Sequence, residues 1–528
     1  MFSLISFIAF TGLVAVVSYL KTHKDDHAHG KSYFLAGNML TGWVIAGSLM
    51  LTNLSTEQLI GLNGNAYTHG AQVIAWEVIA AIGMVVMALY CFPRYWKGQI
   101  ATVPQFLERR FDKQTRQFLG AVFMFSLVTN LLPFVLYSGA IGMNTLFDVP
   151  EMLGVSDTAA TWIMVWAIGI SGGIYAVFGG LRAVAISDSI NGLGLLIGGL
   201  LIPVLGLAAL GDGNIFAGWG TIVRDIPQQL DPLGTEGDNI PFSTLFTGML
   251  LLNVYYWCTN QSIVQRTFGA KSLKEGQKGI LIAACLKLAG PIYLVLPGII
   301  ALQMFGPDLE KQDLAYPSLV AEVLPPALVG FFGAVIFGAI LSSFNSVLHS
   351  SSTLFGLDIY RGMIKPEATD EETVRVGKRF GIIMALVAMS LAPFIGKAES
   401  LFTLMKMLAA VTNVPILAII AMGMLTTSVS TRAAKISLFT GIVLFALANF
   451  VFANSIGLHW LHVAAIIFAI ICSLMLILSK VYPLKKSRED VALKPETEGA
   501  WSWAKGLGFT VVVMVFLIYT FLHHIGSA

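Results

Sequence analysis

Residues 47–64, GSLMLTNLSTEQLIGLNG, place polar side chains inside a segment that is apolar on both flanks. A charged side chain at the centre of a bilayer costs about 2.5–3.5 kcal/mol on insertion scales, so polar groups at that depth need a reason. A helix that unwinds there frees backbone carbonyl oxygens, which suit a hard cation such as Na⁺. The pattern therefore predicts an unwound, cation-binding segment from Leu51 to Ser55, with Gln58 on the turn beyond it.

The segment 331–356, FFGAVIFGAILSSFNSVLHSSSTLFG, offers a second wall for such a site. Ser342 and Ser343 are adjacent, so one hydroxyl can face a neighbouring helix while the other binds the ion. Serines in membrane helices also commonly bond back to their own chain or join helices. On these residues alone the structural interpretation is the favoured one.

Four ionisable side chains lie deep in apolar runs: Glu77, Asp188, Lys287 and Lys406. Such groups are functional candidates and are expected to pair. A Glu77–Lys287 pair would form a nearly neutral site suited to a polyhydroxylated solute, although a purely structural ion pair is the alternative. A carboxylate solute would more naturally call for an arginine or a bare helix N-terminus. Lys406 could equally extend its amine to a membrane interface.

Three aromatic residues, Tyr255 to Trp257, follow Asn253 directly. A sugar ring has an apolar face, so one of these rings could form the floor of a sugar site. Membrane spans also hold aromatic residues for packing or for interfacial belts, and this simpler interpretation stays open.

The elements that must position these residues are membrane-spanning helices. The chain has 528 residues, 56% hydrophobic and 12% charged, whereas soluble proteins average about 25% charged. Apolar runs of about 20 residues recur throughout, which predicts an all-α polytopic membrane protein; their continuity excludes a β-barrel. The cysteines fall inside these runs and are interpreted as packing residues: Cys91, Cys258, Cys285 and Cys472.

The apolar runs predict about 14 spans. The first lacks a basic leader and is taken as a retained span. Their approximate limits are 2–20, 42–66, 72–93, 117–147, 161–179, 184–210, 243–265, 279–304, 328–356, 378–396, 400–426, 434–454, 458–480 and 503–523. Alternate connections hold 26 of the 32 Lys and Arg residues, which predicts that these connections are cytoplasmic and that both termini lie outside.

Two of these spans carry polar interruptions, around Asn53 in the second and around Asn253 in the seventh. They begin two five-span blocks, 42–210 and 243–426, which must have inverted topology because five is odd. Polar breaks at corresponding positions of inverted halves point to a transporter site near the bilayer midplane. Chance similarity of two short motifs is the alternative. The whole chain, 1–528, is interpreted as one transmembrane domain, with 1–20 and 434–523 as peripheral helices.

Several long stretches resemble the sodium/solute symporter family, especially its sodium/galactose and sodium/glucose cotransporter branch. They occur in the family's order through almost the whole chain: DDHAHGKSYFLAGNMLTGWVIAGSLMLTNLSTEQLIGLNGNAYTHG, ATVPQFLERRFD, GGLRAVAISD, NVYYWCTNQSIVQRTFGAKSLKEGQKG and AILSSFNSVLHSSSTLFGLDIYR. The resemblance implies a LeuT-type inverted five-helix repeat, Na⁺ as the coupling ion, and transport by alternation between outward- and inward-open states.

The resemblance also implies roles for individual residues. Sodium would be held by the carbonyls of Leu51, Leu54 and Ala339 and the hydroxyls of Ser342 and Ser343, and Asp188 would lie on its route to the cytoplasm. Solute would be bound by Gln58, Glu77, Asn253, Tyr256 and Lys287, with Tyr256 as the inner gate and Leu62 and Trp76 as the outer gate. Ala80 and Met407 replace polar residues of the galactose branch, which leaves the solute's identity open.

These observations predict a secondary active symporter, not an enzyme, that imports a neutral polyhydroxylated solute, with a hexose such as galactose or glucose as the specific expectation. The expected partners are that solute, sodium and the lipid bilayer, with no nucleic acid and no obligate protein partner; the expected location is the plasma (inner) membrane. A symporter of the same fold for an organic acid, an amino acid or sialic acid is the first alternative. A membrane solute sensor is a remote one, because no signalling module follows the last span, and proton coupling stays open.

Overall fold

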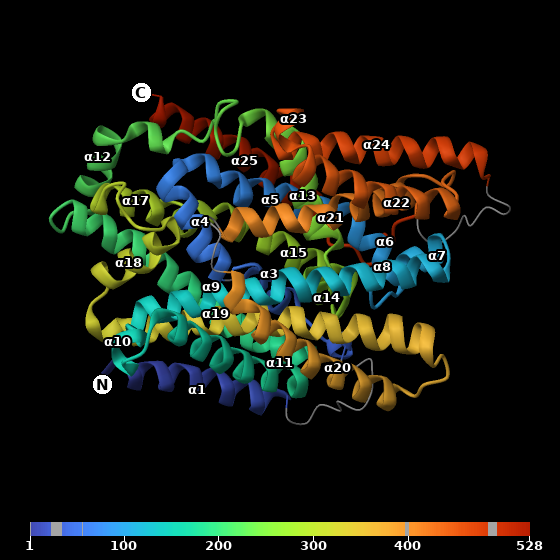
Figure 1. The fold of residues 1–528 in the computed structure, drawn as a ribbon, viewed down its shortest axis with the longest axis horizontal. Coiled ribbons are helices and arrows are strands. Elements are labelled where there is room, and N and C mark those ends of the chain that lie inside the picture. Colours follow the sequence, from blue (N-terminus) through green and yellow to red (C-terminus); the bar gives the residue numbers. More distant parts are fainter. Residues whose placement is uncertain (1, 23–33, 55, 396–400, 484–493, 528) are drawn as a thin grey trace.

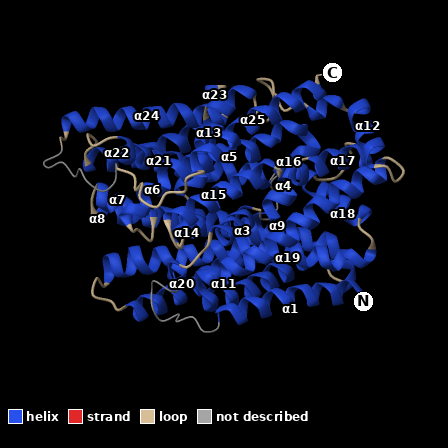
Figure 2. Cartoon of the chain, turned by 180° about the vertical axis from the view of Figure 1, so that it is seen from behind, coloured by secondary structure: helices blue, strands red, loops and turns tan. Residues whose placement is uncertain are grey.

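The regular structure of this protein is helical. A computed structural model describes residues 2–22, 34–54, 56–395, 401–483 and 494–527. Within these ranges β pairing is confined to two isolated bridges, Leu40 with Ala270 and Gly234 with Pro241. Most of the long helices run along one common direction, and both termini lie at the same end of the bundle (Figures 1 and 2).

The first half of the chain forms the helices up to α11. Their bounds are α1 Phe2–Thr22, η1 Ala36–Asn38, α3 Gly42–Asn53, α4 Thr56–His69, η2 Gly70–Ile74, α5 Ala75–Val86, η3 Met87–Cys91, α6 Phe92–Gly98, α7 Val103–Arg110, α8 Lys113–Ser126, η4 Leu127–Leu131, α9 Leu132–Phe147, α10 Val149–Leu153 and α11 Asp157–Leu210. The segments η3 and η4 are single π-helical turns that join the α-helices on either side.

The second half continues with α12 Ile215–Asp225, η5 Pro227–Leu230, η6 Phe242–Phe246, α13 Gly248–Thr259, α14 Gln261–Phe268, α15 Leu273–Leu288, α16 Gly290–Leu294, α17 Leu296–Phe305, η7 Gln312–Leu314, α18 Ala315–Val323 and α19 Pro326–Thr353. The chain then forms η8 Leu354–Ile364, α20 Asp370–Leu391, η9 Ala392–Ile395, α21 Leu401–Leu425, α22 Thr431–Ala446, η10 Leu447–Val451, α23 Ala453–Ile456, α24 Trp460–Val481 and α25 Ala504–Gly526.

The predicted interruption of the second span is present between α3 and α4. Leu54 leaves the helical region with φ −77° and ψ 69°, and its N–H closes the last turn on the carbonyl of Met50. Ser55, the next residue, lies outside the described residues. A break at this depth requires partners for the freed main-chain groups, because lipid offers none.

The interruption of the seventh span lies at Asn260 rather than at Asn253. Asn253 is inside α13 and donates its amide to the carbonyl of Met249 at 3.0 Å. Asn260 is extended, with ψ 119°, and its side chain accepts from the N–H of Ser262 at 3.0 Å, which caps α14. The predicted position was wrong because an asparagine within a helix satisfies its amide on the preceding turn, whereas one at a helix start binds the free N–H groups.

Three further predicted spans differ from the helices of the structure. The predicted span 279–304 is bent by 53° between α15 and the pair α16–α17, where Pro291 lies in the first turn of α16. The predicted spans 161–179 and 184–210 fall on one helix, α11, of 54 residues. A straight helix of that length would extend about 81 Å, well beyond the roughly 30 Å of a hydrocarbon core. The division at 180–183 therefore stays a prediction.

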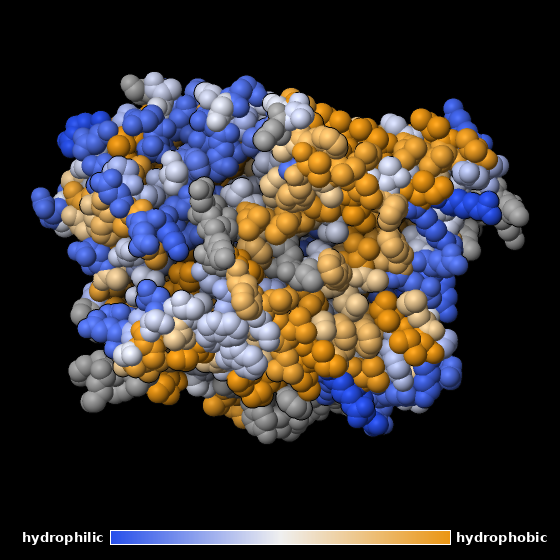
Figure 3. All heavy atoms as spheres, viewed as in Figure 1, coloured by the Kyte–Doolittle hydropathy of each residue, from blue (hydrophilic) through white to orange (hydrophobic). Residues whose placement is uncertain are grey.

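Within the described residues, eight helices are long and apolar enough to cross a membrane, or nine if the bent pair counts as one span. Large apolar side chains on the peripheral helices face outward, among them Phe509 on α25, whose side chain is 71% exposed. Hydrophobic atoms cover the central part of the face in Figure 3, and hydrophilic atoms gather toward its ends. These features are those of a polytopic membrane protein; the count of 14 spans stays a prediction.

The broken helices lie at the centre of the bundle. Helix α3 packs against α11, α15 and α19, and α13 packs against α5 and α21. The α5–α13 approach is close because Gly83 has no side chain: a Cβ atom there would lie 2.9 Å from the carbonyl oxygen of Asn253. This packing places the α3–α4 break beside α19 on one side and beside α5, α13 and α21 on the other.

Candidate functional site

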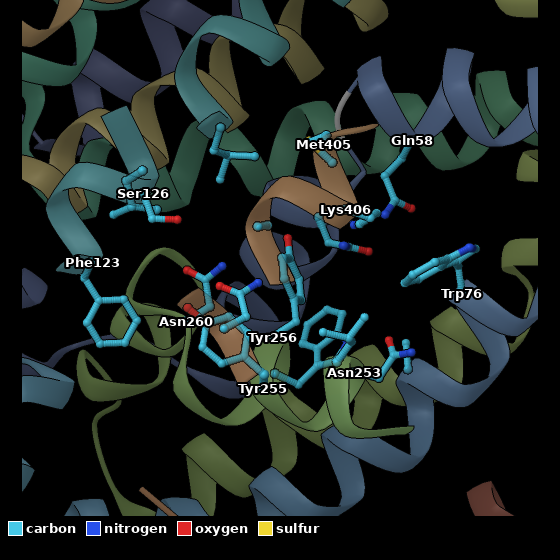
Figure 4. Close-up of a pocket in the computed structure, with 18 of the residues that line it drawn as sticks. Gln58, Trp76, Phe123, Ser126, Asn253, Tyr255, Tyr256, Asn260, Met405 and Lys406 are labelled. Carbon is cyan, nitrogen blue, oxygen red and sulfur yellow. The ribbon is translucent and has the colours of Figure 1, made fainter. Parts of the chain in front are cut away.

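A pocket opens beside the α3–α4 break, between α5, η4, α13, α15 and α21 (Figure 4). The space between its lining residues, together with the solvent at its open side, amounts to about 900 Å³. Its polar lining consists of Asn53, Gln58, Ser126, Asn253, Asn260, Lys287, Lys406 and Asn413, and its aromatic lining of Trp76, Phe123, Tyr255, Tyr256 and Trp257. Amide groups and aromatic rings around one cavity can bind hydroxyl groups and the apolar face of a ring.

The structure brings four of the five predicted solute-binding residues to this pocket: Gln58, Asn253, Tyr256 and Lys287. Glu77 is fully buried behind the wall and forms an ion pair with Lys287, as the sequence predicted. Glu77 therefore acts on the pocket by holding the Lys287 amine. The pair occupies a tight space, since a Cβ atom at Gly290 would lie 2.7 Å from the Glu77 carboxylate.

Among the residues that the structure describes, two amide oxygens of this pocket have no hydrogen-bond partner. They are Oδ1 of Asn53 and Oε1 of Gln58, and both side chains are only 4% exposed. A buried acceptor without a donor costs about 1–3 kcal/mol. Both oxygens can accept a hydrogen bond from a hydroxyl group of a bound solute.

Two of the three predicted gate residues line the pocket, and the third does not. Trp76 lines the pocket and stacks on Trp460, with ring centroids 6.4 Å apart and an interplanar angle of 20°. Tyr256 lies across the pocket from Trp76 (Figure 4). Leu62 is buried but is not among the lining residues, so its role as an outer gate stays a prediction.

The residues that α21 contributes to the pocket wall differ from those predicted from the sequence. Met407, the expected replacement for a sugar-binding residue, does not line the pocket; Met405 and Lys406 do. The Nζ atom of Lys406 lies 5.5 Å from the ring centroids of both Trp76 and Tyr256. Lys406 thus lies in the pocket rather than at a membrane interface, and the sequence left these two placements open because the face of α21 could not be assigned.

The serine pair lies beside the α3–α4 break. Thr52, near the end of α3, lies 3.2 Å from Ser346 of α19, oxygen to oxygen, one turn beyond Ser342. Ser342 and Ser343 are each 2% exposed, and no described residue forms a hydrogen bond with the Ser343 hydroxyl. Unpartnered buried oxygens next to a broken helix fit a cation of the predicted kind.

The main-chain members of the predicted sodium site lie in the same region. Leu51 and Leu54 are in the last turn of α3 and at its cap, and Ala339 is one turn before Ser343 on α19. All three are buried, with side chains no more than 2% exposed. The five predicted sodium ligands are carried by α3, with its cap, and by α19, and these two helices are in contact.

Asp188 belongs to a buried polar cluster that includes Ser48 and Arg266. Its Oδ2 atom accepts from the Ser48 hydroxyl at 3.0 Å and lies 3.9 Å from Nη2 of Arg266. The Ser342 hydroxyl lies close to the Asp188 carboxyl group without a well-aligned hydrogen bond. Arg266 donates from Nε to Thr52 at 3.2 Å and from Nη2 to Ser346.

Sequence reasoning missed Arg266. Arg266 directly follows the seventh predicted span, 243–265, where the sequence predicts a cytoplasmic connection, yet both it and Asp188 are fully buried. The signal that could have found it is its position between Val264 and Phe268, since a solvated arginine rarely alternates with large apolar residues. Arg266 joins α14 to α3, α11 and α19.

Comparisons with known proteins agree with this geometry. The model of the sodium:solute symporter family matches residues 33–441. "Uncharacterized symporter YidK" of Escherichia coli (strain K12) is 47% identical over 481 residues, which cover 91% of this chain and 84% of that protein. The "Sodium/glucose cotransporter" of Vibrio parahaemolyticus is 32% identical over 443 residues, 79% of each chain.

Solved structures share the fold. A Na⁺-coupled sialic acid symporter in a substrate-bound outward-open state superposes with a TM-score of 0.76 at 21% identity, covering 92% of this chain and 99% of that one. The nucleobase-cation-symport-1 transporter Mhp1 in a closed conformation superposes with a TM-score of 0.57 at 13% identity, covering 90% and 97%. The LeuT-type fold predicted from the sequence is confirmed.

The family match spans most of the chain, and these relatives are transporters rather than enzymes. The chain is thus a multi-pass membrane protein that belongs to the sodium:solute symporter family, with sodium as its coupling ion.

Proposed function

We propose that this symporter imports a polyhydroxylated solute of sugar or polyol size by alternating access. The observation that carries the proposal is the pair of buried, unpartnered amide oxygens of Asn53 and Gln58, next to aromatic rings. Relatives support the solute class: a sodium/glucose cotransporter is 32% identical, and human "Sodium/myo-inositol cotransporter 2" is 28% identical over 476 residues. A hexose such as galactose or glucose remains the specific prediction from the sequence.

Sodium would couple to solute through the broken helix. An ion held by Leu51, Leu54 and Ala339 together with Ser342 and Ser343 would join the end of α3 to α19. Asn53 lies between the two α3 ligands, and Gln58 lies on the first turns of α4, so the ion would position both amides for the solute. By reciprocity, if sodium tightens solute binding, solute must tighten sodium binding equally.

The membrane potential would add driving force. Each charge that crosses gains roughly 2.3 kcal/mol per 100 mV, so one Na⁺ can support appreciable accumulation. After release, the ion would pass Asp188 on its way to the cytoplasm. The Ser342 hydroxyl near the Asp188 carboxyl group offers an oxygen on that route.

The proposed location is the plasma (inner) membrane, with both termini outside. The charge distribution of the connections supports this orientation, as does the position of both termini at one end of the bundle (Figure 1).

Uptake into proteoliposomes tests the proposal. The purified protein is reconstituted, an inward Na⁺ gradient is imposed, and uptake of labelled galactose, glucose and myo-inositol is followed, with choline replacing Na⁺ at fixed pH as the control. We expect sodium-dependent accumulation of at least one of these polyols. Equal uptake in choline would refute sodium coupling of that flux, and absence of any flux of hydroxylated solutes would refute the solute class.

A further inference from the structure

The lining of the solute pocket continues beyond Tyr256. Gln58 and Trp76 lie on one side of this tyrosine in Figure 4. Asn260 and Ser126 lie on its other side. Neither Asn260 nor Ser126 is among the residues that the sequence predicts to bind solute, so this part of the pocket has no assigned role.

Polar residues line the pocket at two levels along two of its walls. On α13, Asn253 is followed seven residues later by Asn260, at the cap of the helix. On α21, Lys406 is followed seven residues later by Asn413. Seven residues are about two helical turns, which places the members of each pair on one face and roughly 10 Å apart. We call Asn253 and Lys406 the outer level, and Asn260 and Asn413 the inner level.

A third wall and two aromatic rings complete the inner level. Ser126, at the end of α8, accepts a hydrogen bond at 3.4 Å from the hydroxyl of Thr412, the neighbour of Asn413. The rings of Phe123 and Tyr255 line the pocket and stack, with centroids 6.5 Å apart and an interplanar angle of 25°. The inner level therefore combines amide groups with aromatic rings, as the outer part of the pocket does.

The amide of Asn260 serves both the fold and the pocket. Its oxygen accepts hydrogen bonds from the N–H of Ser262 at 3.0 Å and from the Ser262 hydroxyl at 2.8 Å, which caps α14. Because the oxygen is engaged in this way, the amide nitrogen is the group of Asn260 that can donate to a solute oxygen. Asn413 lies inside α21 and can offer both its amide oxygen and its amide nitrogen.

We propose that the inner level is a second solute site, which binds the solute after it has passed Tyr256 and before it is released to the cytoplasm. This inference rests on the proposed function and extends its site. A hydroxyl group both donates and accepts hydrogen bonds, so a polyhydroxylated solute can satisfy Asn260 and Asn413 together. The apolar face of a sugar or polyol ring fits against Phe123 and Tyr255.

The inner level lies on the expected exit route. The chain runs along α13 and along α21 toward connections that the charge distribution predicts to be cytoplasmic. Asn260 is two turns nearer to that side than Asn253, and Asn413 is two turns nearer than Lys406. A solute that moves from the outer level to the cytoplasm therefore reaches the inner level next.

Transport measured from each face of the membrane tests the inference. Intact cells present the external face and inside-out vesicles present the cytoplasmic face. Sodium-driven transport of labelled galactose, glucose and myo-inositol is titrated in both for the wild type, Asn413→Leu and Asn260→Ser. Serine keeps an oxygen that can cap α14. The matched control is Asn449→Leu, since Asn449 donates to the carbonyl of Phe445 at 3.1 Å and does not line the pocket.

Asn413→Leu and Asn260→Ser should each raise the KM at the cytoplasmic face about tenfold, with a change below threefold at the external face. Asn449→Leu should match the wild type at both faces. Changes of equal size at the two faces, as a purely structural defect would produce, or no change at the cytoplasmic face would overturn the inner site and leave the proposed function intact.

Saturation binding provides an arm that needs no variant. The wild-type protein, purified with Na⁺ present, is titrated with the same three labelled solutes. We expect two molecules of a transported solute per chain, because the two levels are separate along the pocket walls. One molecule per chain would overturn the inference alone, whereas absence of sodium-driven transport of all three solutes would overturn the proposed function as well.

Discussion

Ser343 and the Glu77–Lys287 pair are the residues on which ion binding and solute binding most directly depend. Each is buried, and each has a polar atom for which the described part of the chain provides no hydrogen-bond partner: the Ser343 hydroxyl and Oε1 of Glu77. Buried groups of this kind are costly unless a ligand completes them. Their substitution therefore separates a functional role from a structural one.

Ser343→Ala is expected to raise the sodium concentration for half-maximal uptake about ten- to a hundredfold, because a hydrogen-bonding or ligand contact to a charge contributes about 1.5–3 kcal/mol and 1.4 kcal/mol is tenfold. The matched control is Ser351→Ala on the same helix, whose hydroxyl already donates to the carbonyl of Val347 at 2.9 Å. Sodium titration of uptake measures both. An unchanged sodium requirement in Ser343→Ala would remove this residue from the site.

Glu77→Gln and Lys287→Met should each abolish uptake and lower stability, because removing one partner of a buried pair costs about 3–5 kcal/mol. The double variant should regain most of the melting temperature but not the uptake. The exposed Glu371–Arg375 pair provides the control, whose loss should cost no more than about 1 kcal/mol. Uptake restored in the double variant would show that the Glu77–Lys287 pair is purely structural.

At the scale of elements, the site depends on two broken helices and on what holds them. Helix α3 ends at Asn53 beside α19, and α14 begins at Gln261 after its own break. Arg266 fastens α14 to α3 and α19 through Thr52 and Ser346. Because each break frees the chain locally, these contacts decide how the half-helices are oriented.

Close packing of α5 on α13 leads to an element-scale prediction. In Gly83→Ala the new Cβ atom would lie 2.9 Å from the carbonyl oxygen of Asn253, so one helix must shift. We expect uptake to fall at least tenfold, because overpacking costs about 1–3 kcal/mol and the shift moves Asn253 and its pocket neighbours. Gly506→Ala on α25 meets no atom within 4 Å and should transport like the wild type. Equal uptake in both variants would contradict this account of the pocket wall.

At the scale of the whole molecule, the bundle has two distinct ends. The loop that contains α12 lies at the end that holds both termini, and the start of α20 lies toward the other end (Figure 1). Two inverted repeats of five spans need a bundle with two such ends, because the two blocks begin on opposite sides of the membrane.

The predicted orientation can be measured by cysteine labelling in a background without native cysteines. Thr235 and Glu371 are both exposed and lie in opposite connections. A membrane-impermeant maleimide should label Thr235→Cys in intact cells and Glu371→Cys only after permeabilisation, because the connections rich in Lys and Arg are expected to be cytoplasmic. The reverse pattern would invert the assignment of both termini.

The sequence alone was sufficient for the features that depend on local chemistry. Apolar runs long enough to span a bilayer predicted a helical membrane protein, and the polar segment around Asn53 predicted the break between α3 and α4. The break could be found because polar residues within a span must be satisfied by something other than lipid, and that requirement is visible in the residue types.

Only the tertiary structure decided which side chains share a cavity. It shows that Lys406 lines the pocket and that Glu77 lies behind Lys287. It also shows that the second break lies at Asn260 and that Arg266 is buried. The physical reason is the same in each case. A polar residue on a helix can turn toward a cavity, toward its own backbone or toward another helix, and the choice depends on neighbours that are distant in the chain.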